Sequence, residues 1–229
     1  MWPSPASAGI AMTRRLAAFL WVWASFLLPL HAAAGQNPAQ KAHSNPLGFS
    51  YSLPADWQIV NSQTSLPQLQ QQVAMEATSE AEKRGITCMQ IAFTARHGSP
   101  ASVVVVVALP FECFGETLTK GDLPGFAQGA SEGVMNTLDI ADPLYDSYSL
   151  GTHSMWIERS KGTAKNHPDA NYTVETVCTV LKQAAVCWMA LASDLDTLQA
   201  FEHGAVTLDG DAHPALVTAT SFEKKSPQP

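Results

Sequence analysis

Alternating apolar and polar residues mark where the folded part of the chain begins. Phe49, Tyr51 and Leu53 alternate with serines, and an extended pattern resumes at residues 57–60 after a Pro-Ala-Asp turn. Such alternation predicts two short strands. Apolar residues at helical spacing then follow Ser65, and Gly85 ends the pattern, so we expect a helix over residues 65–84.

The most apolar stretch of the chain comes next. Residues 86–96 and 102–114 read as two longer strands on either side of a His-Gly-Ser-Pro turn, and the second contains consecutive valines from Val103 to Val107. A strand that is apolar on both faces is typical of the centre of a sheet. We therefore expect this valine strand to lie inside the molecule.

A second helix is predicted over residues 122–138. Asp122 can cap it, and apolar residues from Leu123 to Leu138 follow helical spacing. Glycines recur every four residues along it, at Gly125, Gly129 and Gly133. Because glycine destabilises a helix interior, this spacing indicates close approach of the helix to a neighbour, most simply the sheet.

The second half of the chain reads as an antiparallel meander followed by a helix. After Asp142-Pro143, strands are expected over residues 149–160, 172–181 and 184–192, the last two joined by Lys182-Gln183. Ser193 with Asp196 resembles a capping box, which predicts a helix ending at Gly204. Residues 205–222 fit either a hairpin or a loop with a final helical turn.

Together these elements predict an α+β fold. It consists of a mainly antiparallel sheet of six to seven strands flanked by helices, in a single domain over residues 47–222. Residues 35–46 are polar and aperiodic and are expected to form a flexible lead-in, and residues 223–229 a disordered tail.

Residues 1–34 have the three parts of a secretory signal peptide. Arg14 and Arg15 are the basic part, an uncharged apolar run follows to Leu30, and three small residues end at Ala34. The apolar run falls short of the ~20 residues that a membrane-spanning helix needs. We expect cleavage before Gly35 and an exported product, periplasmic or secreted, without a stable membrane anchor.

Removal of this leader makes the chain more acidic. The whole sequence has 13 basic and 20 acidic residues, a net charge of −7, and the leader contains two of the basic residues and none of the acidic ones. The mature chain then has 11 against 20, or −9. An acidic surface lacks the lysines and arginines that contact phosphates, so nucleic acid is not an expected partner.

All four cysteines lie in the exported part, at Cys88, Cys113, Cys178 and Cys187. An oxidising compartment favours disulfides, and four cysteines allow three pairings. A two-residue loop at Lys182-Gln183 places Cys178 opposite Cys187 at a closely spaced antiparallel pair. By similar symmetry about residues 100 and 101, Cys88 can face Cys113. The sequence contains no Cys-x-x-Cys motif, so it gives no local support for a thioredoxin-type redox site or a zinc site.

The element order, together with the opening Phe-Ser-Tyr-Ser-Leu-Pro-Ala-Asp-Trp at residues 49–57, resembles the PsbP/Mog1-like α/β/α sandwich superfamily. Its members include a photosystem extrinsic subunit, a Ran-binding protein and bacterial exported lipoproteins. The resemblance implies a binding or assembly role over residues 47–204, with an envelope protein as a possible partner. The chain lacks the lipid-bearing cysteine of the lipoproteins, and no functional residue carries over.

Two motifs suggest chemistry but fit a structural role better. Ser131 lies in a Gly-x-Ser-x-Gly match, yet it falls inside a predicted helix rather than between a strand and a helix. A serine hydrolase would also need a base, for which His153 and His203 are the candidates. Residues 209–213, Asp-Gly-Asp-Ala-His, can ligate a metal only if the loop curls around it, and a polar turn is the simpler interpretation.

The remaining candidates also favour structure over catalysis. Glu202 and His203 are adjacent near the end of a helix, where exposure to solvent is expected. Trp57, Trp156 and Trp188 can line a ligand cleft, although core packing is the expected role. The sequence thus predicts a non-enzymatic binding or assembly domain, with no catalytic residue, metal or cofactor assigned. An exported hydrolase using Ser131 is the alternative.

Overall fold

The structure is a computed structural model of the chain. The residues that it describes are 43–54, 56–60, 80, 87–99, 101–113, 120–125, 127, 138–208 and 216–217.

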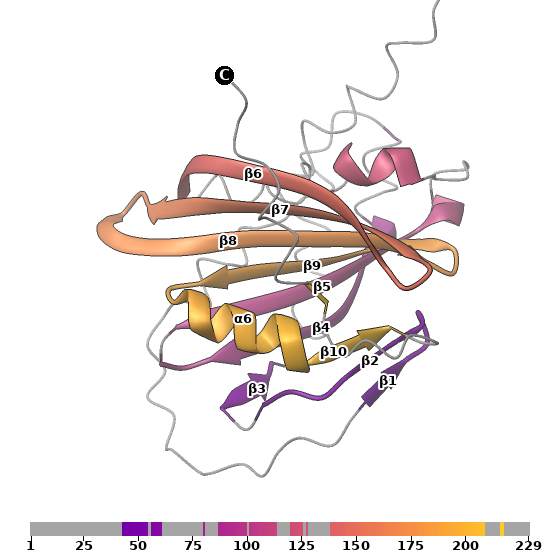
Figure 1. The fold of residues 1–229 in the computed structure, drawn as a ribbon, viewed down its shortest axis with the longest axis horizontal. Coiled ribbons are helices and arrows are strands. Elements are labelled where there is room, and N and C mark those ends of the chain that lie inside the picture. Colours follow the sequence, from indigo (N-terminus) through magenta and orange to yellow (C-terminus); the bar gives the residue numbers. More distant parts are fainter. Residues whose placement is uncertain are drawn as a thin grey trace, which may run out of the picture.

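A seven-stranded antiparallel sheet forms the body of the molecule (Figure 1). Its spatial order is β3-β4-β5-β9-β8-β7-β6, so every pair except β5–β9 joins strands that are consecutive in the chain. The strands, in chain order, are β3 (Trp57–Ile59), β4 (Gln90–His97), β5 (Ser102–Pro110), β6 (Leu138–Leu150), β7 (His153–Ala164), β8 (His167–Leu181) and β9 (Ala184–Ala192).

A smaller sheet and a helix cover one face of this sheet. The smaller sheet has the order β1-β2-β10 and consists of β1 (His43–Asn45), β2 (Phe49–Tyr51) and β10 (Val206–Leu208). Helix α6 (Leu195–Gly204) lies in front of the larger sheet and leads directly into β10 (Figure 1). The chain end therefore returns to pair with its beginning, since Val206 lies opposite Tyr51.

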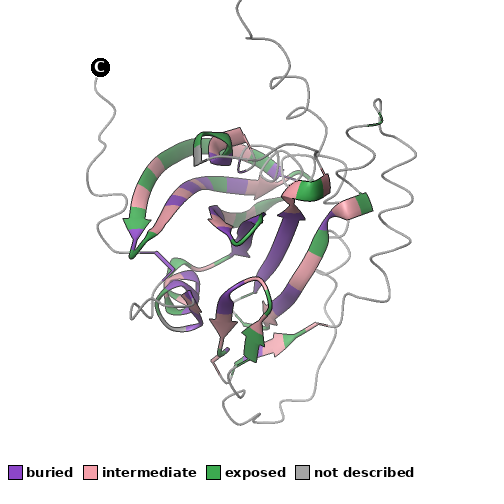
Figure 2. Cartoon of the chain, turned by 90° about the vertical axis from the view of Figure 1, so that its right-hand side faces the viewer, coloured by how far each residue is buried: buried purple, intermediate pink, exposed green. Residues whose placement is uncertain are grey.

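The centre of the large sheet is buried on both faces, as the valine run predicts. Every residue of β9 is buried, as is β5 apart from its last residue (Figure 2). Because side chains alternate along a strand, Val104 and Val106 belong to the core under α6, whereas Val103, Val105 and Val107 belong to a second core on the opposite face. The sheet thus separates two apolar layers, and the antiparallel α+β class is confirmed.

The meander has one more hairpin than the sequence indicated. A single strand over residues 149–160 was expected, but β6 runs from Leu138 to Leu150 and turns at residues 151–152 into β7. The expected boundary at Asp142-Pro143 is instead an irregularity within β6, between Ala141 and Leu144. The prediction was wrong here because an irregularity in an exposed edge strand interrupts the alternating pattern as a turn does.

Several element ends also differ from expectation. The strand expected from residue 86 begins at Gln90, and the one expected to reach residue 114 ends at Pro110, where a short 3₁₀ helix over Phe111–Cys113 begins. Proline at position 110 supplies no backbone N–H for a continued ladder. The second predicted helix does not extend to Leu138, which starts β6.

The ends of the domain differ as well. The expected flexible lead-in contains β1, whose residues pair with β2. The N-cap of α6 is Asp194 rather than Ser193, since the Asp194 carboxylate accepts from the Thr197 backbone N–H at 2.8 Å. The helix predicted over 65–84 lies outside the described residues except for Glu80, and most of the helix predicted over 122–138 does too.

Candidate functional site

A cleft of about 370 Å³ opens beside the turn between β6 and β7. It is lined by residues 147–149 of β6, residues 154–156 of β7, and Gly121 and Leu123. Gly121 belongs to a short 3₁₀ helix, Lys120–Asp122, and Leu123 is buried in the core on the face opposite α6. The cleft therefore lies where the end of a hairpin meets a segment from the middle of the chain.

The β6–β7 turn sets which side chains face the cleft together. Gly151 occupies the first position of this two-residue turn with φ of 58°, a conformation that favours glycine. The turn leaves Ser149 opposite Ser154 and Ser147 opposite Trp156. Directly opposed residues of an antiparallel pair point to the same face, so three hydroxyls and one indole project from the same side of the hairpin.

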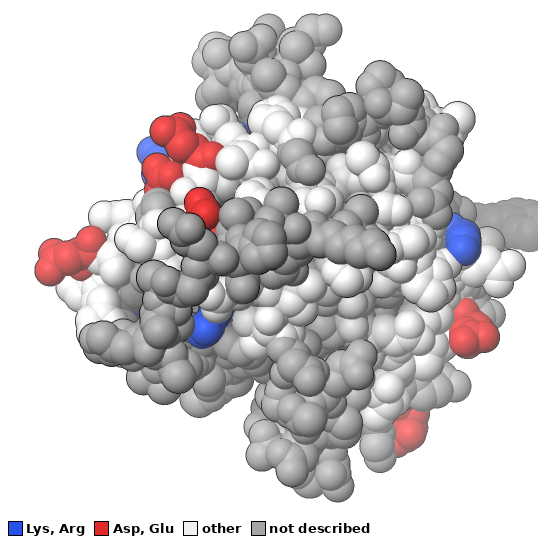
Figure 3. All heavy atoms as spheres, turned by 90° about the horizontal axis from the view of Figure 1, so that it is seen from below, with Lys and Arg blue, Asp and Glu red and all other residues white. Residues whose placement is uncertain are grey.

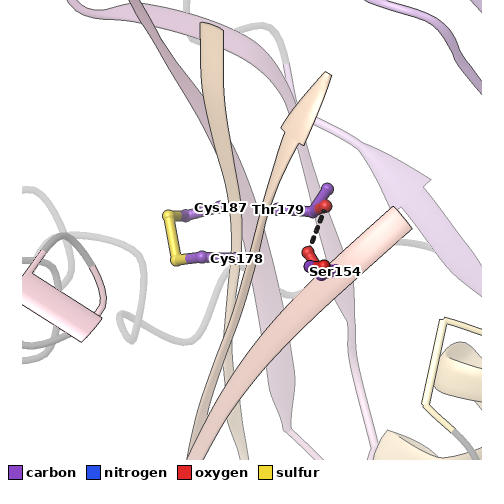
Figure 4. Close-up of a disulfide and its surroundings, with 4 residues drawn as sticks. All are labelled: Ser154, Cys178, Thr179 and Cys187. Atoms are coloured by element: carbon purple, nitrogen blue, oxygen red, sulfur yellow. Dashed lines mark hydrogen bonds between the residues drawn. A yellow bond between two sulfur atoms is a disulfide. The ribbon is translucent and has the colours of Figure 1, made fainter. Parts of the chain in front are cut away.

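Strand β8, beside this hairpin, contains one end of a disulfide and donates a side-chain hydrogen bond to β7 (Figure 4). Cys178 of β8 is the pairing partner of Trp156 and is bonded to Cys187 of β9, with a Cα–Cα distance of 4.2 Å. Thr179, which points to the opposite side of β8 in Figure 4, donates its hydroxyl to the Ser154 carbonyl at 2.7 Å. The strand that contributes Ser154 and Trp156 therefore pairs with a strand that is itself cross-linked to β9, and it accepts one side-chain hydrogen bond from that strand.

The indole of Trp156 has an unused hydrogen-bond donor. Its Nε1 is buried and has no hydrogen-bond partner among the described residues. The Tyr145 ring lies 6.1 Å from the Trp156 ring at an angle of 32°. Buried donors in folded proteins are nearly always paired. The Nε1 of Trp188 in the core is also unpaired within the described part of the chain, but Trp156 lines the cleft, which makes its N–H the candidate donor to a ligand or water acceptor.

Two of the three tryptophans considered as cleft residues are core residues, as predicted. Trp57 and Trp188 are each 2% exposed and belong to the core under α6. Trp156 differs because it packs against the opposite core and also lines the cleft. The sequence Ser-Tyr-Ser-Leu-Gly-Thr-His-Ser-Met-Trp contained a signal for this site, since Gly-Thr between alternating residues is compatible with a tight hairpin.

Beneath α6, on the opposite face of the sheet, one arginine binds two glutamates. Arg159 of β7 pairs with Glu175 of β8 and Glu202 of α6, with nitrogen–oxygen distances of 2.5–2.7 Å. Both carboxylate side chains are 3% exposed, and that of Arg159 is 18% exposed. The sequence-based expectation that Glu202 faces solvent was wrong, because β7 supplies a cation from 43 residues away.

This cluster of Arg159, Glu175 and Glu202 has one negative charge more than positive. Burial, and then the charge of Glu202, raise the pKa of Glu175 well above its usual value, while Arg159 opposes the shift. Burial alone would lower the pKa of Arg159, but the two carboxylates raise it. The arginine therefore stays charged, and Glu175 retains a proton more readily than an ordinary glutamate.

The same face of the sheet binds the C-terminal segment. The Tyr148 hydroxyl donates to the Leu216 carbonyl at 2.6 Å, and the Leu216 N–H donates to the Glu202 carbonyl at 2.7 Å. Burial, and then the charge of Glu175, raise the pKa of the Tyr148 hydroxyl, so it remains a donor. These contacts join the helix, the sheet and residue 216, which gives the charged cluster a structural role.

All four cysteines are paired in the structure. Cys88 is bonded to Cys113, with a Cα–Cα distance of 6.0 Å, and Cys178 to Cys187. Both bridges join the partners that the expected strand registers suggested. The Lys182-Gln183 turn is also present, with Lys182 at φ of 51°, the positive value that such turns require.

The structure describes only some of the other candidates. Ser131 and residues 209–213 lie outside the described residues. His153 begins β7, whereas His203 is exposed in the last turn of α6. In the described part of the chain, no three histidine, cysteine or acidic side chains are grouped as metal ligands would be.

Charged side chains are sparse on the face that Figure 3 shows. Among the residues coloured there, lysine and arginine occur singly rather than as a patch. One exposed pair of opposite charge is Lys161 with Asp142, whose nitrogen and oxygen lie 3.3 Å apart. No helix within the described ranges has the length and apolar character needed to cross a membrane.

Comparisons with known proteins give structural matches alone. No protein-family model and no curated protein sequence matches the chain. The solution structure of PsbP (CyanoP) from the cyanobacterium Synechocystis sp. PCC 6803 is similar at a TM-score of 0.38 and 10% identity, over 76% of this chain and 91% of that one.

A second structural match is LpqN, described as involved in cell envelope biogenesis of Mycobacterium tuberculosis. Its TM-score is 0.33 at 12% identity, over 80% of this chain and 85% of that one. At such identities a likeness concerns the fold alone.

Proposed function

We propose that this protein is an exported, disulfide-bonded binding domain without enzymatic activity, and that the cleft beside the β6–β7 turn is its ligand site. The observation that supports the proposal most is the buried, unpartnered indole N–H of Trp156 in a cleft with three serines. A donor in this position is satisfied when a ligand supplies an acceptor.

The cleft has the composition of a small-molecule site. Ligand pockets typically have volumes of about 300–1,000 Å³ and combine apolar walls with a few polar groups that fix orientation. Here Leu123 and Trp156 supply apolar surface, and Ser147, Ser149 and Ser154 supply hydroxyls. The polar side chains come from a hairpin paired with β8, which the Cys178–Cys187 bridge cross-links to β9, and support by rigid strands favours a specific site.

Export is the second part of the proposal. Disulfides persist in oxidising compartments and are rare in the cytosol, and all four cysteines are paired. The segment of residues 1–34 has the arrangement of a secretory signal. Fractionation of the native cell, followed by intact-mass measurement, tests this part. We expect a chain beginning at Gly35, outside the cytosol, with no thiol alkylated before reduction. A full-length cytosolic chain with alkylated thiols would contradict it.

The cleft can be tested by filling it. In a Ser149→Trp variant the new indole occupies the cleft, while Ser44→Trp makes the same change on exposed strand β1 as a control. We expect the wild-type protein and Ser44→Trp, but not Ser149→Trp, to bind a small molecule from an extract of the native envelope, detected by native mass spectrometry. Equal uptake by all three proteins would refute the assignment of the cleft. Turnover of chromogenic esters would refute the non-enzymatic role.

A further inference from the structure

The lining of the cleft also restricts the chemistry of its ligand. We infer that the cleft binds a neutral, polyhydroxylated compound, such as a sugar ring of a neutral oligosaccharide. This inference rests on the proposed function, because it names the ligand class of the same site. Three properties of the described lining residues support it: their hydrogen-bonding groups, their lack of charge and their aromatic surface.

The hydrogen-bonding groups of the cleft complement hydroxyls. Each serine hydroxyl donates one hydrogen bond and accepts others, whereas the indole N–H of Trp156 only donates. Sugar hydroxyls likewise donate and accept, and a ring oxygen accepts. The pairings Ser149–Ser154 and Ser147–Trp156 arrange the four groups as a grid on one face of the hairpin. A ligand with several hydroxyls can satisfy this grid at several points.

The charges at the cleft favour a neutral ligand. The described residues that line the cleft are all uncharged. Their neighbours in the chain are of both signs, Lys120 beside Asp122 and Asp146, so the adjacent sequence gives no net preference for an anion or a cation. A cation would need an ionised partner in the cleft, but the lining offers hydroxyls, and the Asp146 carboxylate already accepts from the Ser147 backbone N–H at 2.8 Å. Desolvating an ion without a partner is costly, so a neutral ligand is preferred.

The aromatic surface distinguishes a sugar from an apolar ligand and from a simple polar one. The flat indole of Trp156 offers a face on which the C–H groups of a sugar ring can pack. A purely apolar ligand would cover the serine hydroxyls and leave the indole N–H unpaired, which is unfavourable. A ligand with both an apolar face and hydroxyls at its edge meets both requirements.

Titration of neutral trisaccharides into the oxidised protein, purified from the cell that makes it, tests this inference. The probes are glucose, galactose and N-acetylglucosamine trimers, with trigalacturonate, chitosan trimer and decanoate as anionic, cationic and apolar comparators. Binding can be followed by tryptophan fluorescence, because Trp57 and Trp188 are buried elsewhere. We expect saturable binding of at least one neutral trimer and weaker binding of all three comparators.

Variants of the cleft should weaken that binding in a graded way. Loss of one hydrogen bond in Ser149→Ala or Trp156→Phe should weaken affinity by about five-fold, and Trp156→Ala, which also removes the packing surface, by more than about ten-fold. Affinities of the two tryptophan variants are measured by isothermal calorimetry, because these variants lose the fluorescent side chain. Ser44→Ala is the control whose affinity should not change.

The failure of this inference can be told apart from failure of the proposed function. If a charged or apolar comparator binds more tightly than every neutral trimer, or no neutral trimer saturates below ~50 mM, the saccharide inference is overturned. In that case the cleft is still the ligand site if the wild-type protein binds a native small molecule and Ser149→Trp does not. If Ser149→Trp excludes nothing, the proposed function is overturned as well.

Discussion

Replacing Arg159 with methionine gives a direct test of the charged cluster beneath α6. Methionine keeps much of the length of the side chain but removes the cation shared by Glu175 and Glu202. Each glutamate is then buried without a counter-charge, and the folded protein must protonate it. In the unfolded chain the same carboxyls ionise freely, so the cost appears as lost stability.

The size of this loss follows from the burial and pKa of the two carboxyls. Protonating a glutamate with an unfolded pKa of about 4.3 costs about 3.7 kcal/mol at pH 7 and about 1 kcal/mol at pH 5. Burial and the charge of Glu202 already favour a proton on Glu175 in the wild-type protein, so the additional cost falls mainly on Glu202. We therefore expect Arg159→Met to lower the free energy of unfolding by about 3–4 kcal/mol at pH 7 and about 1 kcal/mol at pH 5.

Urea denaturation at both pH values, followed by tryptophan fluorescence with the disulfides intact, measures these losses. Lys161→Met is the matched control, because Lys161 lies on the same strand and its ion pair with Asp142 is exposed. Its loss should change stability by less than about 1 kcal/mol at either pH. If Arg159→Met costs no more than Lys161→Met at pH 7, or costs as much at pH 5 as at pH 7, the reasoning fails.

Glu175→Gln tests the same cluster in a variant that should fold well. Because the folded pKa of Glu175 is raised, its contribution to stability is complete below its unfolded pKa and is lost as the pH rises toward the folded pKa. The slope of this loss is at most about 1.4 kcal/mol per pH unit for one proton. Glutamine mimics the protonated acid, so the variant should lose this slope and be at least as stable as the wild type at pH 7. An unchanged slope would contradict the raised pKa of Glu175.

Three further changes test packing, hydrogen bonding and the bridge. At Gly162 an added Cβ would lie 2.9 Å from a leucine methyl carbon, whereas at Gly98 it meets nothing within 4 Å. Gly162→Ala should therefore lower the free energy of unfolding in urea by about 1–3 kcal/mol, and Gly98→Ala by much less. Equal losses would contradict the close packing at Gly162. Tyr148→Phe removes a donor to a carbonyl of the C-terminal segment and should cost about 1 kcal/mol and speed hydrogen exchange in α6, so unchanged exchange would count against this contact. Replacing both Cys178 and Cys187 with alanine opens a loop of sequence separation 9 and should lower the free energy of unfolding by about 2–3 kcal/mol. The variant should have a lower urea midpoint than the wild type, and a reducing agent should lower the midpoint of the variant less than that of the wild type.

Some of this structure could be predicted because the patterns that encode it are local. The valine run indicated a strand buried on both faces, and Val103 to Val107 alternate between the two cores. The short Lys182-Gln183 connection set the register of β8 and β9, which brought Cys178 opposite Cys187. In such cases the chain geometry over a few residues determines the contact.

The candidate site was less predictable because its parts meet only in the folded chain. Trp156 resembled any other aromatic of a strand, and nothing near it in the sequence indicated that Gly121 and Leu123 would lie beside it. Glu202 resembled an exposed helix residue because its partner Arg159 lies 43 positions earlier.

The amino-acid sequence by itself determined the fold class, the central buried strand and the features of a secretory signal, since alternation and composition act over short distances. It allowed three disulfide pairings and suggested the one that the structure shows. The tertiary structure alone decided that α6 docks through a buried glutamate and that three serines and an indole share a cleft. Those outcomes depend on which distant strands become neighbours, and burial and charge pairing between them follow from the packing of the whole sheet rather than from any local pattern.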